Sequence, residues 1–166
     1  MQKKQIRIRI GAAVAAVLGL LVTSCTGDVL VTESTTFDNY SWDMHEPLTV
    51  TWAPEDTSTL AVMWLYLRHT DQYPYNNIYL FRSISSSQGV EYQDTVNVRL
   101  ADPLGSWIGS GMSNLKTVEI PVGRGAVQFT NQERYTITVT HGMRDTALAG
   151  IREVGFTLEA VEPQPQ

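Results

Sequence analysis

The stretch Thr95-Val96-Asn97-Val98-Arg99-Leu100 shows the clearest alternation of polar and apolar residues in the chain. Val96, Val98 and Leu100 fall on one side of an extended backbone, and the polar residues between them fall on the other. This period of two is typical of a β-strand with one face in a core and one face in water. The stretch therefore predicts a half-buried strand.

The same period of two recurs along most of the chain, on both sides of this stretch. It is found in residues 48–52, 78–84, 118–122, 127–129, 135–139 and 154–158. Leu60–Leu67 is instead continuously apolar, which predicts a central strand buried on both faces. Together these segments predict an all-β, antiparallel β-sandwich of the immunoglobulin-like or jelly-roll-like kind, with about eight or nine short strands.

Breaks between the strands are marked by turn-forming residues. Ser85–Gly89 and Gly123-Arg124-Gly125 are expected to be turns. Met143–Leu148 is the one segment for which we predict a helical turn. The prolines of the 161–166 tail lack an amide donor, so this tail is expected to be disordered. The predicted β-sandwich domain spans residues 47–160.

The first 24 residues have the layout of a secretory signal. A basic start is followed by an uncharged apolar run, Ile10–Val22, which is too short to span a membrane. Val22-Thr23-Ser24-Cys25 resembles the bacterial lipobox, in which the cysteine thiol is acylated and becomes the first residue of the mature protein. We interpret Cys25 as a lipid anchor, and residues 25–46 as an anchored tether with a possible first strand. A free thiol or a catalytic nucleophile at Cys25 are the weaker alternatives.

Charge and composition disfavour some classes of binding partner. The chain has 12 basic and 17 acidic residues, and four of the basic ones precede Ile10, so the segment from Cys25 onward has a net charge of −9. Such an acidic domain is a poor candidate for binding nucleic acid or anionic lipid. Cys25 is the sole cysteine, so the chain has no internal disulfide.

The motifs expected of an enzyme are missing from the sequence. The three histidines lack the spacing of a zinc site, and there is no G-x-S-x-G serine elbow or glycine-rich phosphate loop. We therefore expect no metal, no cofactor and no enzymatic activity. Carboxylate pairs suited to glycoside hydrolysis are not diagnostic in so acidic a chain, and an envelope hydrolase is the third hypothesis.

Aromatic residues are crowded between positions 64 and 92. Four tyrosines are candidates for a surface that stacks on sugars or on a partner chain: Tyr73, Tyr75, Tyr79 and Tyr92. Ordinary packing is the favoured alternative for the group. We expect Trp64 to lie in the core, whereas Tyr73 and Tyr75 flank Pro74 in a loop and are the better surface candidates.

Two longer stretches carry a family resemblance. The first is Asp94-Thr95 leading into 100–111 (LADPLGSWIGSG), and the second includes 141–145 (HGMRD), Gly150-Ile151 and 154–156 (VGF). Together with the lipobox, they resemble the gliding motility lipoprotein family GldH of the Bacteroidetes. The resemblance implies an envelope lipoprotein associated with surface motility machinery and without enzymatic activity. Relatives also occur in species that do not glide.

The residues of this resemblance are read as corners joining strands. They are Asp102, Gly105, Trp107, Gly109, Gly111, Gly142, Met143, Arg144 and Gly150. The glycines permit positive φ or close backbone approach. We expect Trp107 to close one end of the sandwich, and Arg144 to pair with Asp102 or Asp145. These corners either specify the fold or form a partner-binding surface.

A smaller pattern occurs twice, as Asp94-Thr95-Val96 and Asp145-Thr146-Ala147. Both resemble the acceptor for periplasmic O-glycosylation in Bacteroidetes, with Thr95 and Thr146 as the acceptors. Thr146 is the better one because Thr95 lies within a predicted strand.

The sequence thus favours an accessory lipoprotein of an envelope complex. The acyl anchor on Cys25 holds it in a membrane, expected to be the outer membrane, and other envelope proteins are its partners. A carbohydrate-binding surface lipoprotein is the second hypothesis.

Overall fold

The structure is a computed structural model that describes residues 28–55, 58–130 and 133–161. The predicted signal, Cys25 and residues 162–166 lie outside the described residues. Ten strands are present in the described part: β1 (Val29–Thr36), β2 (Ser41–Asp43), β3 (Leu48–Trp52), β4 (Ser58–Thr70), β5 (Asn77–Ser86), β6 (Gly89–Arg99), β7 (Leu115–Thr130), β8 (Tyr135–His141), β9 (Ala147–Ala149) and β10 (Ile151–Ala160).

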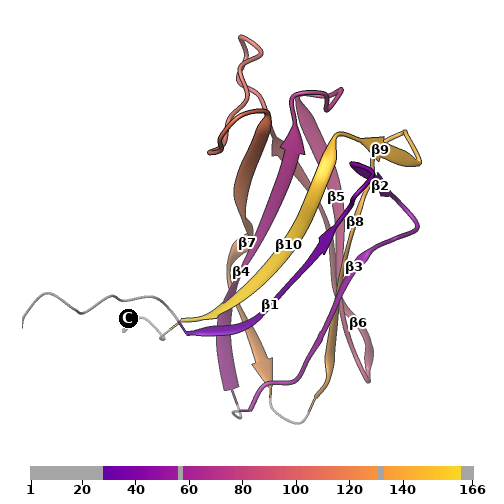
Figure 1. Cartoon of the computed structure of the whole chain (residues 1–166). Helices are drawn as coiled ribbons and strands as arrows, with labels where there is room; N and C mark the ends of the chain where they lie inside the picture. The colour runs from indigo at the N-terminus through magenta and orange to yellow at the C-terminus, as the bar shows by residue number, and fades with distance from the viewer. Residues whose placement is uncertain (1–27, 56–57, 131–132, 162–166) are drawn as a thin grey trace, which may run out of the picture.

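Two four-stranded antiparallel sheets make up the body of the molecule. Sheet A has the strand order β1-β10-β4-β7, and sheet C has the order β3-β8-β5-β6. They lie face to face in Figure 1, with the small β2-β9 pair at the upper end. The predicted β-sandwich is therefore confirmed.

The inner faces of the two sheets form one hydrophobic core, as the alternation predicts. Tyr135, Ile137 and Val139 of β8 are buried, and so are Val98 at the end of β6 and Leu100 just beyond it. The threonines between the β8 core residues are only half-buried. The period of two along each strand has placed the apolar residues in the core.

Strand β4 differs from the prediction that Leu60–Leu67 is buried on both faces. Its burial alternates: Met63, Leu65 and Leu67 are buried, whereas Val62 and Trp64 are half-buried. No second layer of described residues covers the outer face of sheet A, so these outward apolar side chains remain partly in contact with water. The expectation that Trp64 belongs to the core was wrong for the same reason.

The segment predicted to be a tether with a possible first strand contains two strands in its described part, from residue 28 onward. Strand β1 begins at Val29 and pairs along its length with β10, and the short β2 pairs with β9. Trp42 of β2 is fully buried. The sequence of β1 is rich in threonine and serine and does not by itself indicate a partner strand. Pairing with β10 supplies the hydrogen bonds that the backbone N–H and C=O groups of β1 require.

The expected turn at Gly123-Arg124-Gly125 is a bulge inside one long strand. Ala61 of β4 pairs with Val127 of β7, and Met63 pairs with Val122, so the extra residues of β7 are accommodated opposite Val62. Glycine in a strand often marks such a bulge. The two strands predicted on either side of this turn are therefore one strand, β7.

One further prediction near the C-terminal end was wrong. Met143–Leu148 forms no helical turn: a loop follows β8, and β9 begins at Ala147. Val161, the one described residue of the predicted tail, donates its amide to the carbonyl of Leu60. None of the described residues forms a helix long and apolar enough to cross a membrane.

The buried Arg82 forms an ion pair within sheet C and a hydrogen bond to sheet A. The guanidinium of Arg82 is almost fully buried, contacts Asp94 at 2.7 Å and donates to the carbonyl of Val122 on the opposite sheet. It also lies 4.7 Å from the ring centroid of Tyr92. Asp94, at the start of the first resembling stretch, therefore neutralises a charge that would otherwise be unpaired in the core.

Candidate functional site

The segment after β8 forms a corner at the upper end of sheet C. Strand β8 ends at His141, whose ring is buried and lies 3.0 Å, through Nε2, from the carbonyl oxygen of Trp42. The two rings meet edge to face, with centroids 5.1 Å apart. Burial lowers the pKa of His141, so the ring is held in its neutral form. The corner is thereby fixed to the β2-β9 pair.

Strand β5 supplies two exposed aromatic residues beside this corner. Tyr79 and Phe81 point outward from sheet C and are each 43% exposed. The carbonyl of Tyr79 accepts from the amide of Gly142 at 2.7 Å, and its amide donates to Met143 Sδ at 3.4 Å. The backbone of the corner is therefore joined to the strand that carries the exposed rings.

The other side of the corner is closed by Tyr75. Its hydroxyl donates to Asp145 Oδ2 at 2.7 Å. This hydrogen bond raises the pKa of Tyr75, because Asp145 favours the protonated phenol. A surface pocket of about 280 Å³ lies between the two sides, lined by Tyr75, Tyr79, Gly142, Met143 and Arg144.

A second, more polar pocket lies at the same end of β5 and β6. Its volume is about 470 Å³, and its lining comprises Asn76, Asn77, Asn97, Arg99, Ala101, Asp102 and Pro103. Asn77 Nδ2 donates to Asn97 Oδ1 at 2.8 Å, and Asn97 is the cross-strand partner of Tyr79. Amide groups and an exposed tyrosine ring thus share the outer face of sheet C.

The loop 100–114 covers the upper end of the sandwich. Asp102 Oδ1 accepts from the amides of Leu104 and Ser106, which closes a tight turn containing Gly105 (φ +86°). Trp107 is half-buried, and its ring lies 4.7 Å from that of the buried His69. The tryptophan therefore packs against the end of the core, where we expected it.

Two glycines of this loop allow close approach to β7. A Cβ on Gly109 would lie 2.6 Å from the carbonyl oxygen of Thr117, and one on Gly111 would clash with the carbonyl oxygen of Leu115. Both glycines have positive φ. The glycines of the second resembling stretch are similarly constrained: Gly150 has φ +83° and faces the backbone of Tyr73.

The four candidate tyrosines do not form one surface. Tyr73 is buried, and its hydroxyl donates to the carbonyl of Asn77, so its assignment to an exposed loop was wrong. Tyr92 pairs with the inward residue Ile84 and donates to Asp94, which places it at the open edge of the sandwich near Arg82. Tyr75 and Tyr79 line the same pocket, and the buried Tyr73 contacts Tyr75 edge to face, with ring centroids 5.9 Å apart.

Other predicted residues lie apart or without the expected contact. Among the described residues, Arg144 forms no ion pair with Asp102 or Asp145, so that prediction was wrong. Thr95 is exposed in mid-β6 opposite Phe81, and Thr146 is exposed in the loop before β9. No group of three potential metal ligands occurs in residues 28–55, 58–130 and 133–161.

Sequence reasoning missed the polar pocket. Asn76, Asn77 and Asn97 carry no motif, and Asn97 is 20 residues from Asn77 along the chain. The hairpin pairing of β5 with β6 brings them together. Phe81 lies in the same aromatic-rich region as Tyr79, and its spacing of two residues from Tyr79 is the signal that indicates a shared face.

Solved structures show only weak similarity to this fold. A CocE/NonD family hydrolase from Staphylococcus aureus aligns over 82% of this chain and 34% of its own, with 11% identity and a TM-score of 0.41. The carbohydrate-binding module Xyl-CBM35, solved with a glucuronic acid-containing disaccharide, aligns over 85% and 96%, with 16% identity and a TM-score of 0.39. Neither similarity bears on function.

Sequence comparison is more informative. The family model described as GldH lipoprotein matches residues 29–158, nearly the whole described domain. The gliding motility lipoprotein GldH of Flavobacterium johnsoniae is 26% identical over 135 residues, covering 74% of this chain and 83% of its own. A GldH homologue from Christiangramia forsetii is 26% identical over 111 residues, covering 63% and 68%. The chain belongs to the GldH lipoprotein family.

Proposed function

We propose that this protein is a non-catalytic, lipid-anchored accessory component of a surface-motility or related envelope complex, and that it docks another envelope protein. The docking surface is the distal corner, which we define as Tyr75, Tyr79, Phe81, Met143 and Arg144. Membership of a lipoprotein family supports the anchor at Cys25. The names of the two relatives support a link to gliding motility.

The exposed aromatic pair beside a methionine is the observation that carries the proposal. Tyr79 and Phe81 keep 43% of their surface exposed although they lie on a well-ordered strand. Tyrosine, phenylalanine, methionine and arginine are enriched at protein interfaces, and aromatic anchors dominate their energetics. The pocket between Tyr75 and Met143 would receive a side chain of the partner.

A binding role suits the titratable groups of the corner better than a catalytic one. Asp145 is held by the hydroxyl of Tyr75, and His141 is buried against Trp42. Both side chains are therefore engaged in contacts that hold the corner together. Loops positioned by the rigid scaffold of a sandwich are suited to present such a surface.

Site-specific photo-crosslinking in cells tests the docking surface. A photoreactive amino acid at position 81 should give an adduct with an envelope protein. The same residue at position 34, an exposed site on the opposite sheet, should not. Met143→Ala should weaken the adduct at position 81. The same adducts from both positions, or none from position 81, would contradict the proposal.

Metabolic labelling tests the anchor separately. Cys25→Ser should abolish incorporation of labelled palmitate, and density-gradient separation should place the wild-type chain in the outer membrane. Undiminished labelling of the variant would refute the assignment of Cys25. Recovery in the inner membrane would refute only the prediction that the chain lies in the outer membrane.

Carbohydrate binding is the second candidate, and the polar pocket favours it. Asparagine, arginine and aspartate side chains beside an exposed tyrosine ring are the groups that hydrogen-bond and stack on sugars. A glycan array probed with the chain from Thr26 onward tests it. Specific binding that is lost in Tyr79→Ala and in Asn97→Ala would favour this function over protein docking.

A further inference from the structure

The lower half of the outer face of sheet A is apolar. Strand β4 points Leu60, Val62 and Trp64 outward there, and all three are half-buried. The register places Val29 of β1 in the same cross-strand row as Val62, with Glu159 of β10 between them. Val29 is 57% exposed, and Val161 lies beside Leu60. We call these five apolar residues the basal patch.

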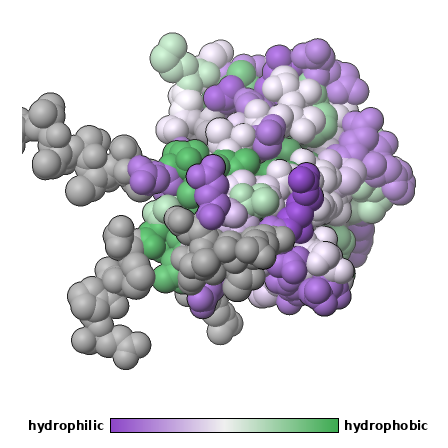
Figure 2. All heavy atoms as spheres, turned by 90° about the horizontal axis from the view of Figure 1, so that it is seen from below, coloured by the Kyte–Doolittle hydropathy of each residue, from purple (hydrophilic) through white to green (hydrophobic). Residues whose placement is uncertain are grey.

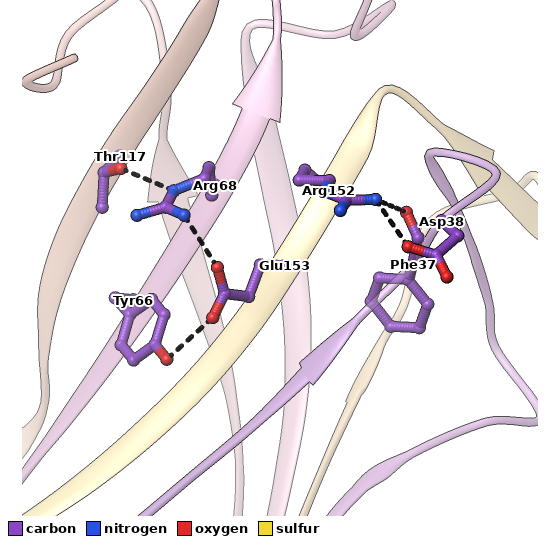
Figure 3. Close-up of polar contacts among 7 residues, drawn as sticks. All are labelled: Phe37, Asp38, Tyr66, Arg68, Thr117, Arg152 and Glu153. Atoms are coloured by element: carbon purple, nitrogen blue, oxygen red, sulfur yellow. Dashed lines mark hydrogen bonds and ion pairs between the residues drawn. The ribbon is translucent and has the colours of Figure 1, made fainter. Parts of the chain in front are cut away.

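The same face becomes charged toward its upper half. There Glu153 of β10 accepts hydrogen bonds from Arg68 at 3.0 Å and Tyr66 at 3.2 Å, and Arg152 contacts Asp38 at 3.0 Å (Figure 3). Among the described side chains of β1, β10 and β4 in the rows of the basal patch, Glu159 alone is charged. The outer face of sheet A is therefore apolar in its lower half and charged in its upper half.

The predicted lipid anchor is attached next to the apolar half. Strand β1 begins and β10 ends at this lower end of the sandwich (Figure 1), where hydrophobic surface gathers in the view from below (Figure 2). Cys25 precedes Asp28 by three residues. Even a fully extended chain separates their Cα atoms by only about 11 Å. An acylated Cys25 would thus hold Val29 within a short distance of the lipid headgroups.

We propose that the basal patch lies on the zwitterionic lipid surface in which the acylated Cys25 is embedded, so that sheet A faces the membrane. The proposal rests on the acylation proposed above. Tryptophan and aliphatic side chains are favoured at the boundary between headgroups and acyl chains. A net charge of −9 from Cys25 onward opposes an anionic surface. The ammonium groups of phosphatidylethanolamine would instead be counter-ions for Glu159.

This orientation has a consequence for the distal corner. Tyr79 and Phe81 point outward from sheet C, which is the opposite face of the sandwich from the basal patch. With sheet A on the membrane, these rings face away from the lipid. Sheet A then contacts the bilayer, and sheet C remains accessible to a protein partner.

Fluorescence quenching by brominated lipid tests the proposal. The acylated mature chain, from Cys25 onward, is reconstituted into vesicles of phosphatidylethanolamine and phosphatidylcholine that carry bromine in the upper part of the acyl chains. Tryptophan emission should be quenched, and Trp64→Phe should remove most of that quenching. Trp107→Phe, at the upper end, should leave it unchanged. Equal quenching in the wild type and in Trp64→Phe would overturn the proposal.

Two controls separate the alternatives. Trp52 ends β3 in sheet C at the same lower end, so quenching lost in Trp52→Phe instead would show end-on contact and overturn the face-on arrangement. Val29→Asp should reduce the quenching of Trp64, whereas Ser34→Asp, also exposed on β1, should not. An equal effect of the two aspartates would likewise count against the basal patch.

Flotation of the vesicles distinguishes the anchor from the docking. If the chain does not float with the vesicles, both the assignment of the acyl anchor and the docking proposal are overturned. If the chain floats but Trp64 is not quenched, the anchor stands and the docking proposal alone is overturned.

Discussion

The ring of Phe81 lies directly over the α carbon of Gly142, so that a Cβ at position 142 would come within 2.5 Å of Phe81 Cζ. The two residues are 61 positions apart in sequence, and the pairing of β5 with β8 brings them together. The Phe81 ring, and not a positive φ, is therefore what favours glycine at position 142. This contact shapes the distal corner.

Substitution of two glycines should have unequal effects on stability. Gly142→Ala should cost less than about 1 kcal/mol, because the exposed Phe81 ring can swing aside. Gly150→Ala should cost about 2 kcal/mol or more, because its Cβ would meet the backbone of Tyr73 and its φ is +83°. Urea unfolding measures both. Equal losses would contradict this account of the corner.

Removing one residue of the buried ion pair should destabilise the domain more than replacing both residues. Asp94→Ala should destabilise the domain by about 3 kcal/mol, because the buried Arg82 guanidinium loses its carboxylate. Adding Arg82→Met should recover part of that loss, since the second change removes the uncompensated charge. The two variants are compared by urea unfolding. A double variant no more stable than Asp94→Ala would argue against a penalty from the unpaired charge.

The two buried histidines should make stability depend on pH. Burial lowers the pKa of His69 and His141 below the ordinary value of 6.5, so the unfolded chain binds protons before the folded one does. Their contribution is complete above pH 6.5 and declines as the pH falls below it. Each histidine contributes at most about 1.4 kcal/mol per pH unit.

Unfolding measured at about pH 7.5 and about pH 5.5 checks this dependence. His69→Gln and His141→Gln should each reduce the loss of stability between the two conditions. The acidic residues titrate equally in the variants and the parent, so the difference reports the histidine. An unchanged loss would mean that the imidazole is protonated in the folded state.

Modification of Thr146 should exceed that of Thr95. Thr146 is exposed in a loop, whereas Thr95 lies in mid-β6 with its backbone paired to Phe81. An enzyme that must bind an extended acceptor segment reaches a loop more readily than a paired strand. Mass spectrometry of the native protein should find a glycan on the Thr146 peptide, and Thr146→Ala should remove it. Unmodified peptides for both threonines would refute the O-glycosylation hypothesis.

Much of the fold could be predicted because its signals are local. The alternation in β5, β6, β8 and β10 identified strands whose inner residues, such as Ile78 and Phe156, are buried. The Ser85–Gly89 break is the turn of the β5–β6 hairpin. Less was predictable where one local pattern fits two structures. The Gly123–Gly125 segment has the composition of a turn, yet pairing with β4 makes it a bulge.

The candidate site was predicted only in part, because its residues come from separate strands. The aromatic group and the 141–145 corner were each identified, but not their contact. Tyr73 and Tyr75 look equivalent around Pro74, yet one is buried under Trp107 and the other bonds to Asp145. Which of them faces solvent depends on loops contributed by distant parts of the chain.

By itself, the sequence determined the class of fold and predicted the signal and the anchor, because periodicity, turn composition and the lipobox pattern each reside within a few consecutive residues. The tertiary structure alone decided which outward side chains meet. Val29 and Val62 share a patch, and Phe81 covers Gly142, because strand order and register join segments 33 or more residues apart. A period of two fixes the side of a strand on which a residue lies. It does not fix what covers that side.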